Sequence, residues 1–209
     1  MNNRYKYPRT PHLSWSPGFT DDDIIDNEKK FLNKIVVVTE KMDGENATLY
    51  NNYYHARSID SKNHESRAWI KSFQSIISKD IPNGWRFCGE YLFAKHSIKY
   101  NNLDSYFYLF SIWNDLNECL SWEETTIFAD ILEIPLPKVF YLGEYDKKFI
   151  QNIKLDFNIQ EGYVVRNIDS FKFENFQKNV SKFVRKNHVQ TDKHWMQTVV
   201  EKNILNKVK

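Results

Sequence analysis

The feature that most constrains the fold of this chain is a succession of short β-prone runs joined by turns instead of by helices. The first run, IVVVTEKM at 35–42, is rich in β-branched residues. NATLYNNYYHARS at 46–58 follows it, and the pair Asn51 and Asn52 is placed there for a hairpin turn. Further β-prone runs lie at 85–93, 106–113, 138–142, 162–167 and 180–185.

Helical patterns are fewer and lie between these runs. In 65–78 the apolar residues recur at the spacing of one helix face, and 121–132 opens with a Ser-x-x-Glu capping box. A last helix is predicted across about 192–205, within the C-terminal segment 192–209. Strands and turns without a regular βαβ order predict an α+β fold with mostly antiparallel sheets and helices packed outside them.

The size and composition of the chain fit one globular domain spanning residues 1–209. With 41% hydrophobic and 27% charged residues, the chain resembles neither a disordered nor a fibrous protein. Residues 1–23 lack a helical or strand period and are expected to form an ordered N-terminal arm. No window is apolar enough to span a membrane, and two distant cysteines, Cys88 and Cys119, suit a reducing compartment. We therefore expect a cytoplasmic protein, as a monomer.

A possible chemical centre begins at EKMDGEN, residues 40–46, where a lysine lies two residues before an Asp-Gly turn. A surface hairpin can produce Lys-x-Asp-Gly without any function, so the motif is weak alone. Its companions make it specific, because five more chemistry-bearing segments follow in order. They are HARS (55–58), FCGEYLFAKHS (87–97), YFYLFSIW (106–113), EGYVVRN (161–167) and SKFVRKNH (181–188).

Taken together, these segments resemble the nucleotidyl motifs I, Ia, III, IIIa, IV and V of the covalent nucleotidyltransferases. That superfamily includes RNA ligases, DNA ligases and mRNA capping enzymes, and the resemblance spans roughly residues 35–190. The chain is most similar to the branch of bacteriophage RNA ligase 2 and the RNA-editing ligases. The resemblance implies an ATP-grasp-like ligase adenylation domain and an ATP-dependent RNA ligase. Such an enzyme transfers AMP from ATP to Lys41, then to a 5′-phosphate, and seals that end to a 3′-hydroxyl.

The resemblance also assigns roles to individual residues. It implies catalytic roles for Lys41, Glu161 and Lys182, and nucleotide-binding roles for Glu40, Lys41, Asn46, Arg57, Glu90, Phe110, Glu161, Lys182 and Arg185. Phe110 matches the aromatic residue that stacks on adenine, and Arg57 matches the arginine that binds phosphate. The chain departs from the family pattern at Ser111, where relatives often carry Asp, and at Val184, where motif V usually has a second lysine. Arg185 or Lys186 is the candidate for that second base.

The chemistry of lysine points to a metal ion as well. A lysine with its reference pKa near 10.4 is neutral in only roughly one molecule in a thousand at pH 7.4, and only the neutral amine is a nucleophile. Neighbouring carboxylates raise the pKa further, so they suit this site only if a divalent cation offsets them. By resemblance, Asp43, Glu90 and Glu161 would hold Mg²⁺ or Mn²⁺ largely through its waters.

Other functions stay open at this stage. The chain could be a DNA ligase, a capping-type nucleotidyltransferase or a non-catalytic nucleic-acid-binding module. Only about 20 residues follow His188, which leaves no room for the OB-fold that DNA ligases and capping enzymes append. That favours a small RNA ligase acting on nicked or preassembled RNA ends, or one that works with a substrate-binding partner. His12, His96 and Lys95 could contact nucleic-acid phosphates or form an ordinary solvated surface.

Overall fold

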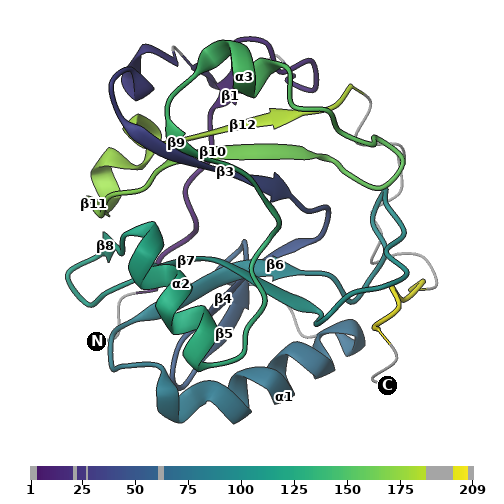
Figure 1. The fold of residues 1–209 in the computed structure, drawn as a ribbon. Coiled ribbons are helices and arrows are strands. Elements are labelled where there is room, and N and C mark those ends of the chain that lie inside the picture. Colours follow the sequence, from purple (N-terminus) through teal and green to yellow (C-terminus); the bar gives the residue numbers. More distant parts are fainter. Residues whose placement is uncertain (1–3, 21–22, 27, 61–63, 187–199, 207–209) are drawn as a thin grey trace.

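A computed structural model describes residues 4–20, 23–26, 28–60, 64–186 and 200–206, and it consists of two facing β-sheets with helices at their outer surfaces (Figure 1). The first sheet has the order β2-β1-β12-β10-β3-β9, and the second has the order β11-β8-β7-β6-β4-β5. Most neighbouring strands are antiparallel, whereas β1 runs parallel to both β2 and β12. The predicted α+β architecture is confirmed.

The strands of the first sheet are β1 (His12–Leu13), β2 (Ile25–Asp26), β3 (Ile35–Lys41), β9 (Val139–Glu144), β10 (Gly162–Asn167) and β12 (Val180–Val184). Those of the second are β4 (Glu45–Leu49), β5 (Tyr54–Ala56), β6 (Arg86–Tyr91), β7 (Phe107–Trp113), β8 (Glu118–Cys119) and β11 (Phe171–Lys172). The α-helices are α1 (Ala68–Ile77), α2 (Trp122–Ile131) and α3 (Lys147–Gln151), and short 3-10 helices span Glu28–Phe31, Glu65–Arg67, Ser78–Asp80 and Phe173–Lys178. Every β-prone run predicted above contains a strand. None of the described helices has the length and apolar character needed to cross a membrane.

Both faces of β3, which lies between β10 and β9 in the first sheet, are buried, and this explains its unbroken apolar run. Val36 and Val38 pack into the outer core of the first sheet, together with residues of β10 and α3. Val37 and Thr39 point to the opposite side, between the sheets. Because successive side chains of a strand point to opposite faces, Lys41 also projects between the sheets.

The two helices predicted at 65–78 and 121–132 are present as α1 and α2, whereas α3 was not predicted. Helix α1 follows the short 3-10 turn Glu65–Arg67 and packs Ile70 and Ile77 against the core of the second sheet. Helix α2 begins with the predicted capping box, because Glu124 N donates to Ser121 Oγ at 3.1 Å and Ser121 N donates to Glu124 Oε2 at 2.9 Å.

The C-terminal segment is the main departure from the predicted fold. Residues 192–199 of the predicted helix lie outside the described residues, and 200–206 are not helical. This end instead forms isolated β-bridges, Ala94 with Lys202 and Leu103 with Leu205. The helical prediction for 200–205 is wrong because these residues find their hydrogen-bond partners on a neighbouring loop, not within a helix of their own.

Residues 4–20 of the N-terminal arm pack against both sheets. His12 pairs with Lys182 of β12, so the arm extends the first sheet. Tyr7 packs edge-on against Phe110 at 5.2 Å and Phe176 at 5.3 Å between ring centroids. The arm therefore closes one end of the space between the sheets.

Candidate active site

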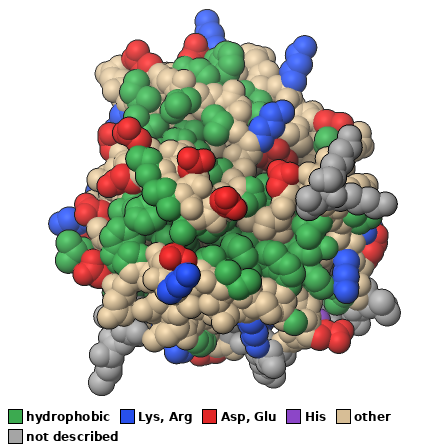
Figure 2. Space-filling model, turned by 60° about the horizontal axis from the view of Figure 1, so that its bottom comes forward, with side chains coloured by type: hydrophobic (Ala, Val, Ile, Leu, Met, Phe, Trp, Pro, Cys, Tyr) green, Lys and Arg blue, Asp and Glu red, His purple; other side chains and the backbone are tan. Residues whose placement is uncertain are grey.

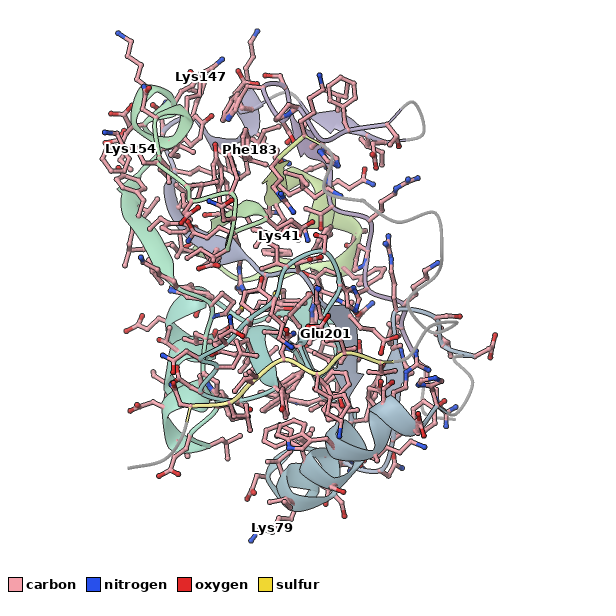
Figure 3. All side chains as sticks on the ribbon, turned by 90° about the vertical axis from the view of Figure 1, so that its right-hand side faces the viewer. Lys41, Lys79, Lys147, Lys154, Phe183 and Glu201 are labelled. Atoms are coloured by element: carbon pink, nitrogen blue, oxygen red, sulfur yellow. The ribbon has the colours of Figure 1, made fainter. Side chains whose placement is uncertain are left out.

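A cavity of about 500 Å³ lies between the two sheets and contains most of the chemically interesting residues. From the first sheet and its connections it is lined by Thr39, Glu40, Lys41, Glu161, Val164 and Lys182. From the second sheet and its connections it is lined by Asn46, Arg57, Glu90, Phe110, Ser111 and Cys119. In Figure 3 Lys41 lies in the layer between the sheets, whereas Lys79, Lys147 and Lys154 lie at the periphery.

Lys41 forms an ion pair with Glu161 inside this cavity. The distance from Lys41 Nζ to Glu161 Oε2 is 2.6 Å, with the lysine side chain 25% and the glutamate side chain 4% exposed. Burial disfavours the charged amine, but Glu161, Glu90 and Asp43 outweigh burial and raise the pKa of Lys41 above its ordinary value. The protein alone therefore holds Lys41 as a cation, the unreactive form of the amine.

The strand register brings Lys41 and Glu161 together. Lys41 ends β3 directly opposite Gly162 of β10, and Glu161 immediately precedes that glycine. After Lys41 the chain turns through Met42–Gly44 and enters β4 of the second sheet. The Lys-x-Asp-Gly segment is thus the crossing between the two sheets, which fixes its lysine at their junction.

Glu90 extends from β6 toward the same amine. Its Oε1 accepts a hydrogen bond from Gly44 N at 3.1 Å, and it lies opposite Asn46 in the strand register. Burial raises the pKa of Glu90 to about 7. The Lys41 cation lowers this pKa, whereas the nearby Glu161 carboxylate raises it. Asn46 Oδ1 is buried and has no hydrogen-bond partner among the residues that the structure describes. Glu40, which also lines the cavity, accepts a hydrogen bond from Gln160 Nε2 at 3.2 Å.

Lys182 and Arg57 supply positive charge to the cavity. Lys182 projects from β12 on the same face as Val180 and Val184, and Arg57 follows β5 and is exposed at the surface. Burial and, after it, the nearby Lys41 cation together lower the pKa of Lys182 to about 8. Near neutral pH this ammonium is charged but loses its proton more easily than an ordinary lysine.

The residue two positions after Lys182, Val184, lines the cavity with an apolar side chain. Neither candidate for the second base of this segment lines it. Arg185 Nη2 donates instead to Ser97 Oγ at 3.3 Å, and Lys186 is exposed. The structure therefore brings only Lys182 of the three basic residues into the cavity.

Aromatic residues form the apolar part of the cavity wall. Phe110 projects from β7, with Tyr7 of the N-terminal arm and Trp122 of α2 among its companions in the lining. The sequence prediction did not include Tyr7 or Trp122, because neither belongs to a recognisable motif.

Arg166 is a lining residue whose position could have been predicted. Alternation along β10 places Gly162, Val164 and Arg166 on one face of the strand, and Val164 and Arg166 both line the cavity. Its guanidinium is buried and hydrogen-bonds the carbonyl oxygens of Phe110, at 3.3 Å, and of Leu120. Arg166 thereby links β10 to the second sheet.

Three further residues singled out from the sequence, Asp43, His12 and His96, differ in their surroundings. Asp43 does not line the cavity, because its Oδ2 accepts hydrogen bonds from Ser97 N, Ser97 Oγ and Ile98 N at 2.7, 2.7 and 2.8 Å. His12 is buried, with its Nδ1 2.9 Å from Ser16 Oγ, so it does not form a surface for nucleic acid. His96 lines the cavity.

The carboxylates of the cavity suit a divalent cation that is bound mainly by water molecules and by oxygen atoms of the substrate. Among the residues described by the structure, no group of three His, Cys, Asp or Glu side chains converges closely enough to hold a metal ion. Two carboxylates, Glu90 and Glu161, nevertheless face the cavity. Mg²⁺ is commonly bound in this way, by one or two carboxylates together with waters and substrate phosphates.

Comparison with known proteins identifies the family. The family model for RNA ligase matches residues 34–184, which include every motif from Lys41 to Lys182. The chain belongs to the RNA ligase family. No curated protein matches it in sequence.

Solved structures of ligases share the fold of this RNA ligase family member. An archaeal ATP-dependent RNA ligase matches with a TM-score of 0.59 and 17% identity, over 86% of this chain and 48% of that one. The Naegleria gruberi RNA ligase solved with PPi matches with a TM-score of 0.54 and 18% identity, over 75% of this chain and 51% of that one. A putative ATP-dependent DNA ligase from Aquifex aeolicus matches with a TM-score of 0.58 and 16% identity, over 87% of this chain and 50% of that one. The predicted ligase adenylation fold is confirmed, and the chain spans about half the length of these proteins.

Proposed function

We propose that this chain is an ATP-dependent RNA ligase that works through a covalent lysyl-AMP intermediate on Lys41. The observation that carries the proposal is the Lys41–Glu161 pair, 2.6 Å apart in a cavity that also holds Glu90, Lys182 and Phe110. A buried cluster of this kind has little use in a protein that only binds nucleic acid. The Naegleria gruberi ligase has been solved with ATP and Mn, which supports the same pairing of nucleotide and divalent cation here.

In the first step Lys41 Nζ attacks the α-phosphorus of ATP, a nitrogen–phosphorus bond forms, and pyrophosphate leaves. Glu161 Oε2, at 2.6 Å, is positioned to accept the proton that the ammonium must lose beforehand. A divalent cation beside Glu90 and Glu161 would supply the positive charge that offsets these carboxylates and favours the neutral amine. Lys182 and Arg57 would neutralise the phosphates and hold them in line for attack.

In the two later steps AMP passes to a 5′-phosphate, and a 3′-hydroxyl then displaces AMP to form the phosphodiester. Each step is an in-line displacement at phosphorus, so positioning and charge neutralisation contribute most of the catalysis. Arg57 lines the cavity and is exposed to solvent, and we assign it to the phosphate of AMP or of the end being sealed. Asn46 would orient the terminal nucleotides through its buried side-chain oxygen.

A sealing assay tests the proposal directly. Matched duplexes with a single nick, carrying RNA or DNA on either side of it, are incubated with the protein, Mg²⁺ and either ATP or GTP. We expect sealing with ATP and an RNA 3′-hydroxyl strand. Sealing of DNA alone would make this chain a DNA ligase, and a GTP requirement would indicate capping-type chemistry.

Phe110 is expected to contribute to ATP affinity by stacking on adenine. The Phe110→Ala variant should bind ATP about 5- to 150-fold more weakly, which corresponds to roughly 1–3 kcal/mol for one base stacked on an aromatic ring. Phe176→Ala is the matched control, because Phe176 also packs on Tyr7 but does not line the cavity. Calorimetric titration with ATP measures the affinity of each variant. Equal loss of affinity in the two variants would mean that only packing is affected.

Lys182 should make ATP binding depend on pH. Its pKa is lowered to about 8, so the cation is present below that pH and is lost as the pH rises through it. Affinity for ATP should therefore fall about tenfold between pH 7.5 and 9.5, as for the loss of one charge-assisted hydrogen bond. Lys182→Arg keeps its charge throughout and should remove this fall. ATP titrations at constant ionic strength over this pH range measure the effect. The same dependence of affinity on pH in the wild type and in Lys182→Arg would contradict the role of Lys182.

A further inference from the structure

A C-terminal strap, residues 201–206, crosses the loop that joins β6 to β7. Figure 3 shows the strap passing over this face of the molecule, with Glu201 labelled on it. Its backbone is bonded to the loop from end to end: Lys95 N donates to Glu201 O at 2.7 Å, Asn203 N to Phe93 O at 2.9 Å and Asn206 N to Leu103 O at 2.7 Å. Glu201 also forms ion pairs with Lys95 at 2.8 Å and Lys99 at 3.0 Å.

Asn203 is the centre of this contact. It is 2% exposed, and its amide satisfies three backbone groups of the loop. Nδ2 donates to Leu92 O at 2.8 Å and to Ala94 O at 3.3 Å, while Oδ1 accepts from Tyr100 N at 2.9 Å. Because Leu92, Ala94 and Tyr100 are themselves buried, these groups would lack partners without Asn203.

The same loop holds the turn that follows Lys41. Tyr100 Oη accepts a hydrogen bond from Asp43 N at 2.9 Å. The Asp43 carboxylate in turn accepts the three hydrogen bonds from Ser97 and Ile98 described above. Met42 packs in one apolar cluster with Tyr100, and Leu205 of the strap packs against that cluster. One residue, Tyr100, is therefore bonded through its backbone to the strap and through its hydroxyl to the Lys41 turn.

We propose that the strap is part of the active-site scaffold, and that Asn203, acting through Tyr100, is a positioning residue for Lys41. The inference rests on the proposed function, since it concerns the rate at which Lys41 reacts. Asn203 fixes the loop, the loop fixes Asp43, and Asp43 fixes the turn that sets the direction of the Lys41 side chain. A misplacement of a reacting group by about 1 Å can lower a rate about 100-fold.

The test is single-turnover self-adenylylation with labelled ATP, in which the rate constant and the final amplitude are measured separately. Asn203→Ala should lower the rate constant about 100-fold, and Tyr100→Phe, which removes one oxygen atom, about tenfold. Both variants should reach the wild-type amplitude and bind ATP as tightly as the wild type. The double variant should be no slower than Asn203→Ala alone, because the two residues act in one chain of contacts.

Asn206→Ala is the matched control on the same strap. It removes the bond from Asn206 Nδ2 to Asp104 Oδ1, 2.7 Å long, which does not lead to the Lys41 turn, and should leave the rate constant unchanged. A variant with a reduced amplitude and an unchanged rate constant would show a purely structural role and overturn the inference. If Asn203→Ala does not fold, Tyr100→Phe decides alone, by the same rate criterion. No adduct in the wild-type protein would overturn the proposed function as well, whereas a wild-type adduct with unchanged variant rates would overturn this inference only.

Discussion

The Lys41→Arg variant should form no covalent adduct with AMP, while retaining the fold and the ability to bind ATP. Arginine keeps the positive charge opposite Glu161, so the ion pair inside the cavity is preserved. Its guanidinium cannot be deprotonated in a protein, so it provides no nucleophile. We expect the labelled protein to fall at least about 1,000-fold, because one covalent step depends entirely on that nitrogen.

The measurement is transfer of label from α-labelled ATP to protein, followed under denaturing conditions. Lys79→Arg is the control, since Lys79 lies at the periphery in Figure 3 and does not line the cavity. It should be labelled as the wild type is. Persistent labelling of Lys41→Arg would mean that another residue is the nucleophile.

A second large effect is expected at Gly162 of β10, where the close approach of β12 leaves no room for a side chain. A Cβ at this position would lie 1.9 Å from Phe183 O and 3.1 Å from Val184 Cα, both in β12. These neighbours are backbone atoms of a paired strand, so they cannot move aside without breaking the sheet. We expect Gly162→Ala to lower the free energy of unfolding by about 3 kcal/mol, which corresponds to a fall in Tm of roughly 6–12 °C.

Thermal unfolding followed by circular dichroism checks this, with Gly143→Ala as the control. The nearest atom to a Cβ at Gly143 is Tyr141 Oη at 3.0 Å, the end of a side chain that can rotate away. That variant should lose less than about 1 kcal/mol. Similar Tm values for the two variants would contradict the tight approach of β10 and β12. Because Glu161 precedes Gly162, the destabilised variant should also form the adduct more slowly.

Local patterns were sufficient to predict the longer strands of this fold and the helices α1 and α2, but not α3 or the two-residue strands. The β-branched run of β3, the Asn51–Asn52 hairpin and the capping box of α2 are short-range signals, and each has its predicted structure. The C-terminal segment was mispredicted beyond 199, because the partners of Asn203 lie about 100 residues earlier in the chain. Apolar periodicity carries no information about such contacts, which override helix propensity.

The site was predictable in its charged residues and less so in its walls. Lys41, Glu90, Glu161 and Lys182 meet in one cavity, as expected from motifs whose chemistry requires them together. Tyr7 belongs to an arm without any period, so nothing in the sequence placed it beside Phe110. Because side chains alternate along β12, Val184 lines the cavity, and the following residue, Arg185, hydrogen-bonds Ser97 instead. The spacing of the basic residues in the sequence did not predict this difference.

Asp43 gives a further example of what a motif does not specify. The sequence pairs it with Glu90 and Glu161 as a metal ligand, yet in the structure its carboxylate organises the loop after β6. An acidic residue next to a reactive lysine can serve either purpose, and the choice depends on which backbone N–H groups the fold brings near it.

The proposed function depends on a covalent bond between Lys41 and AMP, and the decisive experiment is to locate the AMP in the protein. The protein is incubated with ATP and Mg²⁺ or Mn²⁺ and digested, and the peptides are sequenced by mass spectrometry. We expect one AMP on the peptide that contains Lys41, stable in alkali and lost in acid. AMP on a different residue, or no modified peptide with either cation, would contradict it.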